Sequence, residues 1–394
     1  MPEHLEPTKT ARRDLSRPVL FALTVFLLTS NVALYFVYKG NVDQLAERTR
    51  QELGAARESG AGETQHTLDT SSVPEADPGL AAYRIVNAHD HLYQQKHLDK
   101  YLAAAERLGI VRTVLVASSD YTLKGEGNDP RRGNAWNTNE ILTCEHAAPD
   151  KIVTYCAIHP DDENKEDLLR QYLAAGVHGL KLYTGHSNFY DRPLDDPVMM
   201  PVYEFCEQNN FPICWHINLS KPNFLAEFLR VMERFPRLKV IVPHFGVTFY
   251  RPGGEAWNQF WQILDQYPGV YTDCSWGTRN ILVHGLEVVS ANVPAFRDAI
   301  IKYQDRILWG TDMVVTGNAE KTEAWIESVL RACREMLEKD VYYFWMAADG
   351  SPYDYPGTKN PYGQLRGLAL EPDVLRKIYE TNYDAFVALR PGEG

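Results

Sequence analysis

Two histidines separated by one residue are the first feature of this sequence that could do chemistry. They lie at the end of an apolar, β-branched run, Val86-Asn87-Ala88-His89-Asp90-His91-Leu92. Residues two apart in a strand point to the same face, so the imidazoles of His89 and His91 could bind one divalent metal ion. Histidine pairs of this spacing also arise by chance, and a single strand histidine is more often a hydrogen-bonded structural residue. The pair alone leaves both interpretations open.

Other ionisable residues lie near the ends of further apolar runs, and they are Lys181, His216, His244 and Asp312. Each of them, taken alone, could equally be a hydrogen-bonded structural residue. If these runs are parallel strands of a barrel, their carboxyl ends meet at one face, where the catalytic residues of such folds collect. We therefore expect these four side chains to gather beside the histidine pair.

Weaker candidates follow other runs. His159 precedes Pro160 and could reach the same site or simply cap its own strand. Arg279, Arg131 and Arg132 fall in loops that would follow two of the strands. They could bind a substrate carboxylate, although most arginines are ordinary surface residues.

The elements that must position these residues alternate between short β-rich runs and longer helical patterns, which is typical of parallel β/α construction. The predicted strands are Tyr83–His91, Val111–Ser118, Lys151–His159, Val177–Tyr183, Pro212–Asn218, Leu238–Phe245, Val270–Ser275 and Arg306–Asp312. The helical patterns include Leu168–Ala175, Met200–Asn209, Phe224–Phe235, Ala295–Tyr303 and Lys321–Glu338. Eight such units predict a TIM (β/α)8 barrel, with its active site at the carboxyl ends of the strands. A doubly wound sheet is the alternative.

The amino-terminal part predicts a membrane anchor ahead of the barrel. Residues 18–38 carry no charge, and a helix of this length, at about 1.5 Å per residue, spans a hydrocarbon core of roughly 30 Å. Basic residues precede it in the tail 1–17, so the positive-inside rule places the tail in the cytoplasm. We expect a single-pass protein of the cytoplasmic membrane whose carboxyl-terminal domain is exported to the periplasmic side. A cleaved signal peptide is the alternative.

Two connecting segments follow the anchor. Residues 39–59 are rich in helix formers with a narrow apolar stripe, which predicts a helical stalk that is solvated or docks against another membrane subunit. Residues 60–80 are polar and aperiodic, as expected of a linker. The barrel domain then covers residues 81–394.

Composition limits the partners and the redox chemistry. The chain has 394 residues, 44% of them hydrophobic, and a formal net charge of −12. This balance argues against a nucleic-acid partner, because phosphate binding needs a basic surface, and favours a small-molecule substrate or a protein partner. The six cysteines show no C-x-x-C spacing, so we expect buried free thiols, with a Cys206–Cys214 disulfide left open.

Several short motifs together resemble the amidohydrolase superfamily, in its amidohydrolase-2 branch of metal-dependent hydrolases with a TIM-barrel fold. The resemblance covers residues 84–390. The motifs that carry it are Ala88-His89-Asp90-His91, Gly179-Leu180-Lys181-Leu182, Cys214-Trp215-His216, Pro243-His244-Phe245-Gly246, Trp309-Gly310-Thr311-Asp312 and the ending from Leu370-Glu371-Pro372 through Lys377-Ile378-Tyr379 to Asn382.

The resemblance implies a role for each member of the site. The implied ligands of a divalent metal, one ion or two, are His89, His91, His216 and Asp312. Zinc is expected, with manganese or iron as alternatives. Asp312 would also accept a proton from the attacking water, and His244 would orient or protonate the substrate, or bind a second ion. Lys181 would be carbamylated to bridge two ions, or would bind an anionic group of the substrate.

Three functions follow as hypotheses. The first is a membrane-anchored, exported hydrolase that uses metal-activated water on a small-molecule amide, ester or lactone. The second is a metal-dependent non-oxidative decarboxylase of the same branch, which the lysine at position 181 mildly disfavours. The third is an accessory or scaffolding subunit of a photosynthetic or respiratory membrane complex, for which the anchor and stalk would supply the docking surface.

Overall fold

The computed structural model describes residues 83–118, 133–187, 192–277, 280–353 and 360–390. The predicted tail, anchor, stalk and linker, residues 1–80, lie outside the described residues, as do Arg131, Arg132 and Arg279. Among the described residues, no helix is both long enough and apolar enough to cross a bilayer. The transmembrane helix therefore stays a prediction from the sequence.

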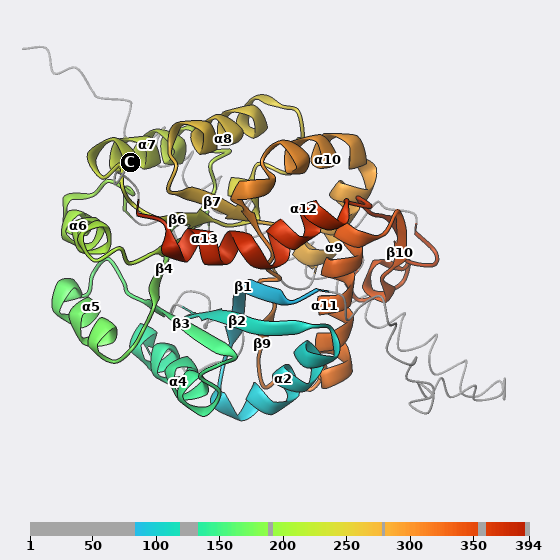
Figure 1. Cartoon of the computed structure of the whole chain (residues 1–394), viewed down its shortest axis with the longest axis horizontal. Coiled ribbons are helices and arrows are strands. Elements are labelled where there is room, and N and C mark those ends of the chain that lie inside the picture. The colour runs from blue at the N-terminus through green and yellow to red at the C-terminus, as the bar shows by residue number, and fades with distance from the viewer. Residues whose placement is uncertain (1–82, 119–132, 188–191, 278–279, 354–359, 391–394) are drawn as a thin grey trace, which may run out of the picture. The chain divides into compact units, whose positions relative to one another are not determined.

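One curled parallel sheet forms the centre of the described domain (Figure 1). Its strands are β1 (Ile85–Leu92), β2 (Ile110–Val116), β3 (Ile152–Ala157), β4 (Gly179–Gly185), β5 (Ile213–Ile217), β6 (Val240–Val242), β7 (Val270–Asp273), β8 (Ile307–Leu308) and β9 (Val314–Val315). From β1 to β8, each strand pairs in parallel with the next one in the sequence. A doubly wound sheet reverses its strand order at a switch point, so this alternative is wrong and the TIM-barrel type of fold is confirmed.

The two edges of the sheet are joined by the segment that contains β8 and β9. β8 pairs with β7, whereas β9 pairs with β1. Between them, the backbone amide of Ala88 in β1 donates to the carbonyl of Trp309 at 2.8 Å. The prediction of one continuous strand, Arg306–Asp312, was wrong here, because the chain bends away from β7 after Leu308 and resumes strand geometry only beside β1.

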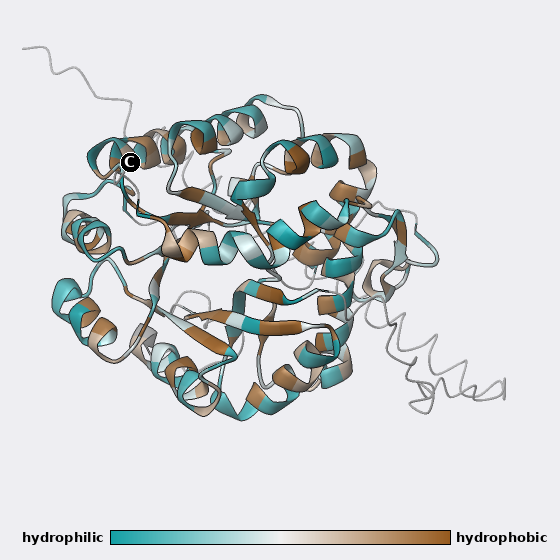
Figure 2. Cartoon of the chain, in the orientation of Figure 1, coloured by the Kyte–Doolittle hydropathy of each residue, from teal (hydrophilic) through white to brown (hydrophobic). Residues whose placement is uncertain are grey.

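Helices surround the sheet with their apolar faces turned towards it (Figure 2). They are α2 (Leu98–Arg107), α4 (Gly133–Ala147), α5 (Lys165–Ala174), α6 (Met200–Gln208), α7 (Pro222–Arg234), α8 (Glu255–Gln266), α9 (Asn280–Ala291), α10 (Val293–Lys302) and α11 (Glu323–Glu338). Because helices cover one side of every strand and side chains fill the other, β1 and β4 are buried along their whole length. After α11, an antiparallel pair of short strands, β10 (Val341–Tyr343) and β11 (Gln364–Arg366), precedes the last helices.

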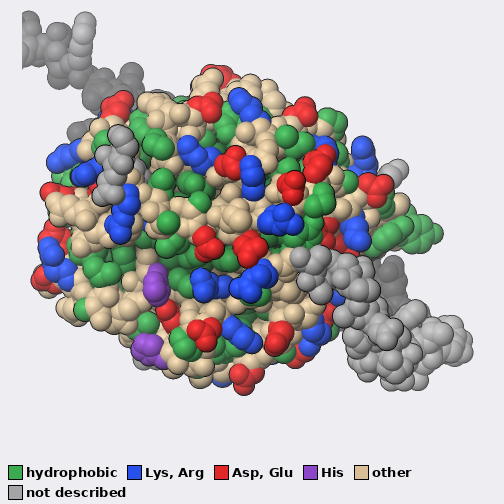
Figure 3. Space-filling model, in the orientation of Figure 1, with side chains coloured by type: hydrophobic (Ala, Val, Ile, Leu, Met, Phe, Trp, Pro, Cys, Tyr) green, Lys and Arg blue, Asp and Glu red, His purple; other side chains and the backbone are tan. Residues whose placement is uncertain are grey.

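Inside the barrel, a second apolar cluster fills the space between the strands. It contains Val86, Ala88, Val114, Val116, Tyr155, Cys214, Ile241, Tyr271, Leu308, Tyr383 and Phe386. The last two come from α13 (Asn382–Ala388), which follows α12 (Pro372–Arg376) and the π-helical turn η9 (Lys377–Thr381). Figure 1 shows α13 lying across the sheet in this view. All six cysteines are buried and free, as predicted, and acidic and basic side chains are interspersed over the visible surface (Figure 3).

We predict that replacing Phe386 by alanine lowers the free energy of unfolding by about 3–5 kcal/mol, the usual cost of removing a buried phenylalanine ring. Phe386 is fully buried and its ring centroid lies 4.9 Å from that of Tyr271. The matched control is Val387→Ala, next in sequence but 44% exposed, which should change stability by less than about 0.5 kcal/mol. Urea unfolding followed by tryptophan fluorescence measures both, and equal losses would contradict the assignment of α13 to the core.

Candidate metal centre

The side chains of His89 and His91 emerge from the same face of β1, as the strand periodicity predicts. Their ring centroids lie 5.5 Å apart, and both residues are buried. Oδ1 of Asp312 lies 3.3 Å from Nε2 of His89 and 3.0 Å from Nε2 of His91. The ligand atoms of these three residues all lie within 4.8 Å of one another, so together they could hold a metal ion.

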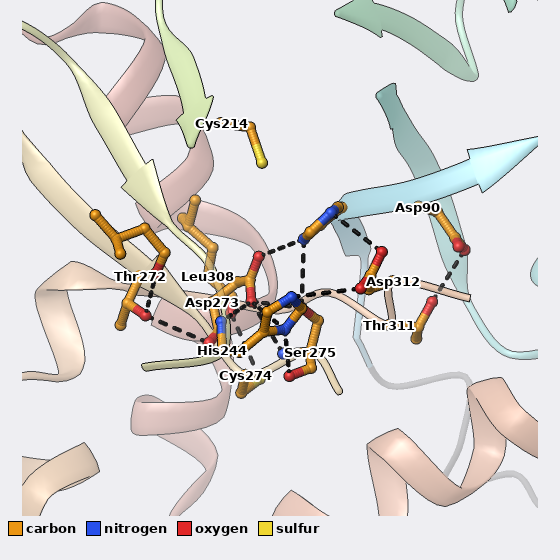
Figure 4. A network of polar contacts seen from close by, with 12 residues as sticks. Asp90, Cys214, His244, Thr272, Asp273, Cys274, Ser275, Leu308, Thr311 and Asp312 are labelled. Carbon is orange, nitrogen blue, oxygen red and sulfur yellow. Dashed lines mark hydrogen bonds and ion pairs between the residues drawn. The ribbon is translucent and has the colours of Figure 1, made fainter. Parts of the chain in front are cut away.

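The second oxygen of Asp312 faces His244 on the other side of the site. Oδ2 of Asp312 lies 3.3 Å from Nε2 of His244. The other ring nitrogen of His244, Nδ1, lies 2.9 Å from both the carbonyl oxygen and the hydroxyl of Ser275. Because a carbonyl can only accept, Nδ1 carries a proton and Nε2 is the nitrogen that can exchange one. Figure 4 shows His244, Ser275 and Asp312 converging here.

Two predicted positions in the strands need correction. Lys181 was placed near the end of its strand, but it is the third residue of β4, because this strand continues to Gly185. Its buried Nζ lies 2.9 Å from Nε2 of His89 and 3.5 Å from Sγ of Cys214. His244 was placed inside a strand, but β6 ends at Val242 and His244 begins the short 3-10 segment η6 (His244–Val247).

His216 and His159 have different surroundings from the other predicted residues. The His216 ring lies 5.0 Å from that of His244 and 4.3 Å from that of His186. Among the described residues, His216 is not a member of the compact group that could hold a metal. The backbone amide of His159 donates to Asp162, and its Nδ1 accepts from the amide of Asp161. These bonds lie within its own loop.

Asp273 is the site residue that the sequence reasoning missed. Its Oδ2 accepts from Nδ1 of His89 at 2.8 Å, which leaves the Nε2 lone pair of His89 facing Asp312. Its Oδ1 accepts from the backbone amide of His244 at 3.0 Å and from the hydroxyl of Ser275 at 2.5 Å. Carboxylates that orient a histidine in this way fix its tautomer. Asp273 is the last residue of β7, so the strand-end criterion would have found it.

Asp90, between the two histidines, joins β1 to its neighbours beneath the site. Its Oδ2 accepts from the hydroxyl of Tyr101 and from the hydroxyl of Thr311, each at 2.9 Å. The amide of Asn87 donates to the same oxygen at 2.9 Å. Burial raises the pKa of Asp90 to about 8, although these hydrogen bonds oppose the shift. The central residue of the motif therefore holds the strand in place and does not face the metal-binding group.

Electrostatics favour the protonation states that bind metals. Burial and then the charge of Lys181 lower the pKa of His89 to about 4, and burial also lowers the pKa of His91. Burial alone would raise the pKa of Asp312, but its interactions with His89, His91 and His244, which include a hydrogen bond from His91, hold it well below its ordinary value. Two neutral imidazoles and one ionised carboxylate are a donor set that suits zinc and other divalent transition metals. The residues present thus fit such an ion.

Solved structures of similar fold cover most of this chain. A probable 2-pyrone-4,6-dicarboxylic acid hydrolase from Acinetobacter baumannii is 13% identical, with a TM-score of 0.52, and the match covers 78% of this chain and 100% of that chain. A Pseudomonas putida structure with the same provisional name is 13% identical at a TM-score of 0.50, covering 77% and 97%. At this identity the likeness shows the fold alone. No curated protein matches the sequence significantly.

The family assignment rests on a match of the sequence itself. The profile of the family described as Amidohydrolase matches residues 91–382, which is most of the chain and nearly all of the barrel domain. The family is metal-dependent, and the histidine and aspartate group lies where the barrel strands end. The chain therefore belongs to the amidohydrolase family and is an enzyme of the TIM-barrel type.

Proposed function

We propose that this protein is a metal-dependent hydrolase that uses water to cleave an amide, ester or lactone bond in a small molecule. One observation carries the proposal: both oxygens of Asp312 are engaged, Oδ1 with two strand histidines and Oδ2 with a third histidine. A carboxylate shared in this way can help to hold an ion on one side and exchange a proton on the other.

His89, His91 and Asp312 would hold the ion, for which we propose zinc. A divalent ion bound there would polarise a carbonyl group and make water more acidic. Asp273 keeps the Nδ1 proton of His89 in place, and so presents the Nε2 lone pair to the site. His216 is still a predicted fourth ligand. Its ring lies beside that of His244, and His216 is not a member of the compact group formed by His89, His91 and Asp312.

Asp312 and His244 would move the protons of the reaction. The ionised carboxylate of Asp312 can accept a proton from the attacking water. His244 can then receive a proton at Nε2, 3.3 Å from Oδ2 of Asp312, and deliver it to the leaving atom. Lys181 either binds an anionic substrate group or is carbamylated, and an increase of metal content with added bicarbonate would favour the second role.

We also propose that residues 18–38 anchor the enzyme in the cytoplasmic membrane and that the barrel acts on the periplasmic side. The support is the uncharged length of this segment and the basic residues that precede it. Such an anchor would confine the enzyme to substrates of that compartment, or to a membrane complex.

Metal analysis tests the proposed centre. We expect the purified full chain to hold at least one divalent ion, and the double variant His89→Ala, His91→Ala to lose it, because two of the three converging ligands are removed. The control His178→Ala changes an exposed histidine and should keep the ion. Inductively coupled plasma mass spectrometry gives the content, and circular dichroism checks the fold. Equal, negligible metal in wild type and double variant would defeat the proposal.

A substrate screen tests the reaction class. We expect the full chain, purified in mild detergent, to hydrolyse members of a panel of esters, lactones and amides, to lose this activity on chelation and to regain it with zinc. Release of CO₂ from aromatic acids without any hydrolysis would establish a decarboxylase instead. A stoichiometric protein partner that survives purification, together with absent metal, would establish a scaffold.

The orienting role of Asp273 gives a separate prediction. Asp273→Asn should weaken zinc binding by about 10–100-fold, the usual effect of removing a carboxylate that orients a metal-binding histidine. Competition with a chromophoric chelator measures the affinity. The matched control is Asp298→Asn, which changes an exposed carboxylate on α10. Unchanged affinity in Asp273→Asn would show that His89 is oriented without this carboxylate.

A further inference from the structure

Four consecutive residues, beginning with His244, adopt the left-handed backbone conformation. The φ angles are +57° for His244, +51° for Phe245, +63° for Gly246 and +57° for Val247. Glycine adopts this region without penalty, but each of the other three residues pays for it, and a β-branched residue such as Val247 is a true outlier. A strained turn of this kind persists only where its surroundings hold it.

Hydrogen bonds hold the backbone of the turn on two sides. The amide of His244 donates to the carboxylate of Asp273, and the amide of Phe245 donates to the hydroxyl of Thr272 at 3.2 Å. On the opposite side, the amide of Leu219, in the loop after β5, donates to the carbonyl of Gly246 at 2.8 Å. These bonds fix where the turn lies in relation to β7 and to the loop after β5.

The ring of Phe245 adds a constraint that the hydrogen bonds do not supply. It is fully buried in an aromatic cluster that also contains Trp257, Trp261, Trp276 and Phe296, with ring centroids 5.8–5.9 Å from its own. A right-handed backbone at position 245 would swing this ring out of the cluster. The opposite side of the turn is filled too, since a Cβ atom on Gly246 would lie 2.8 Å from the ring of Phe260.

We propose that Phe245 is a positioning residue, whose ring locks the left-handed turn so that Nε2 of His244 faces Asp312. The catalytic importance of Phe245 rests on the proposed function, but its positioning of His244 does not. Asp312 also has a positive φ, +51°, so both partners of the 3.3 Å contact are held in a conformation that the isolated chain avoids. The packing of the aromatic cluster keeps His244 in its left-handed conformation.

The test compares two variants that remove the same volume from the same cluster, Phe245→Leu and Phe296→Leu. Phe296 lies on α10, packs against the Phe245 ring without being part of the turn, and is equally buried. Carbethoxylation of His244 by diethyl pyrocarbonate, followed by mass spectrometry on the metal-free full chain, reports how firmly the ring is held. Exposed His178 serves as the internal reference. We expect His244 to react at least about tenfold faster in Phe245→Leu, as local opening becomes easier, and at the wild-type rate in Phe296→Leu.

A rescue variant separates positioning from general loss of stability. Adding Val247→Gly to Phe245→Leu should return the reactivity of His244 towards the wild-type value, because glycine lowers the cost of the left-handed turn. Nitrogen-15 spectra of labelled histidine should show the single Nδ1–H tautomer of His244 in wild type, in Phe296→Leu and in the rescued double variant, and a tautomer mixture in Phe245→Leu.

Three results would overturn the proposal: equal acceleration in Phe245→Leu and Phe296→Leu, no acceleration in Phe245→Leu, or no rescue by Val247→Gly. These measurements need neither bound metal nor turnover. Failure of the hydrolase proposal would appear in the metal analysis and leave the behaviour of His244 unchanged, so the two failures are distinguishable.

Discussion

The closing of the sheet by residues 307–315 is the constraint on which the rest of the structure depends. This segment completes the pairing of β7 through Ile307 and Leu308, then crosses to pair with β1 through Val314 and Val315. The crossing forces a bend between the two short strands, and Asp312 lies in it with a φ of +51°. Its backbone amide donates to the carbonyl of His89 at 2.8 Å. The same backbone geometry that closes the barrel therefore brings the carboxylate of Asp312 to the histidines of β1.

A second carboxylate, Asp273, makes this arrangement rigid. Burying a carboxylate is costly unless hydrogen bonds and opposite charges compensate for lost solvation. Asp273 is fully buried, yet His89, the backbone of His244 and Ser275 all donate to it. These contacts, above all the one with His89, keep the pKa of Asp273 below its ordinary value despite burial. The carboxylate of Asp273 thus fixes two of the three histidines that face Asp312: His89 through its ring and His244 through its backbone amide.

Much of this site could be predicted from the sequence, because the strand periodicity places His89 and His91 on one face and the barrel places strand ends together. The same reasoning failed where backbone geometry departs from a regular strand. Asp312 was assigned to a continuous strand and lies in a bend, and His244 was assigned to a strand and lies in a left-handed turn. Neither departure could be predicted from residue type, since aspartate and histidine adopt that conformation at only a small minority of positions, and phenylalanine and valine disfavour it strongly. Asp273 was missed although it ends β7, because the predicted strand ran on to Ser275 and so placed Asp273 inside the strand.

By itself, the sequence determined the alternation of strands and helices, the residue types available at the strand ends and the family to which the chain belongs. These depend on local periodicity and on short motifs, which can be read along the chain. Only the tertiary structure decided which side chains meet, because the deciding contacts join distant positions: His89 and Asp273 are 184 residues apart. It also decided the strained backbone of residues 244–247 and of Asp312. Such a conformation is unfavourable in the isolated chain and exists here because packing and hydrogen bonds from other elements outweigh its cost.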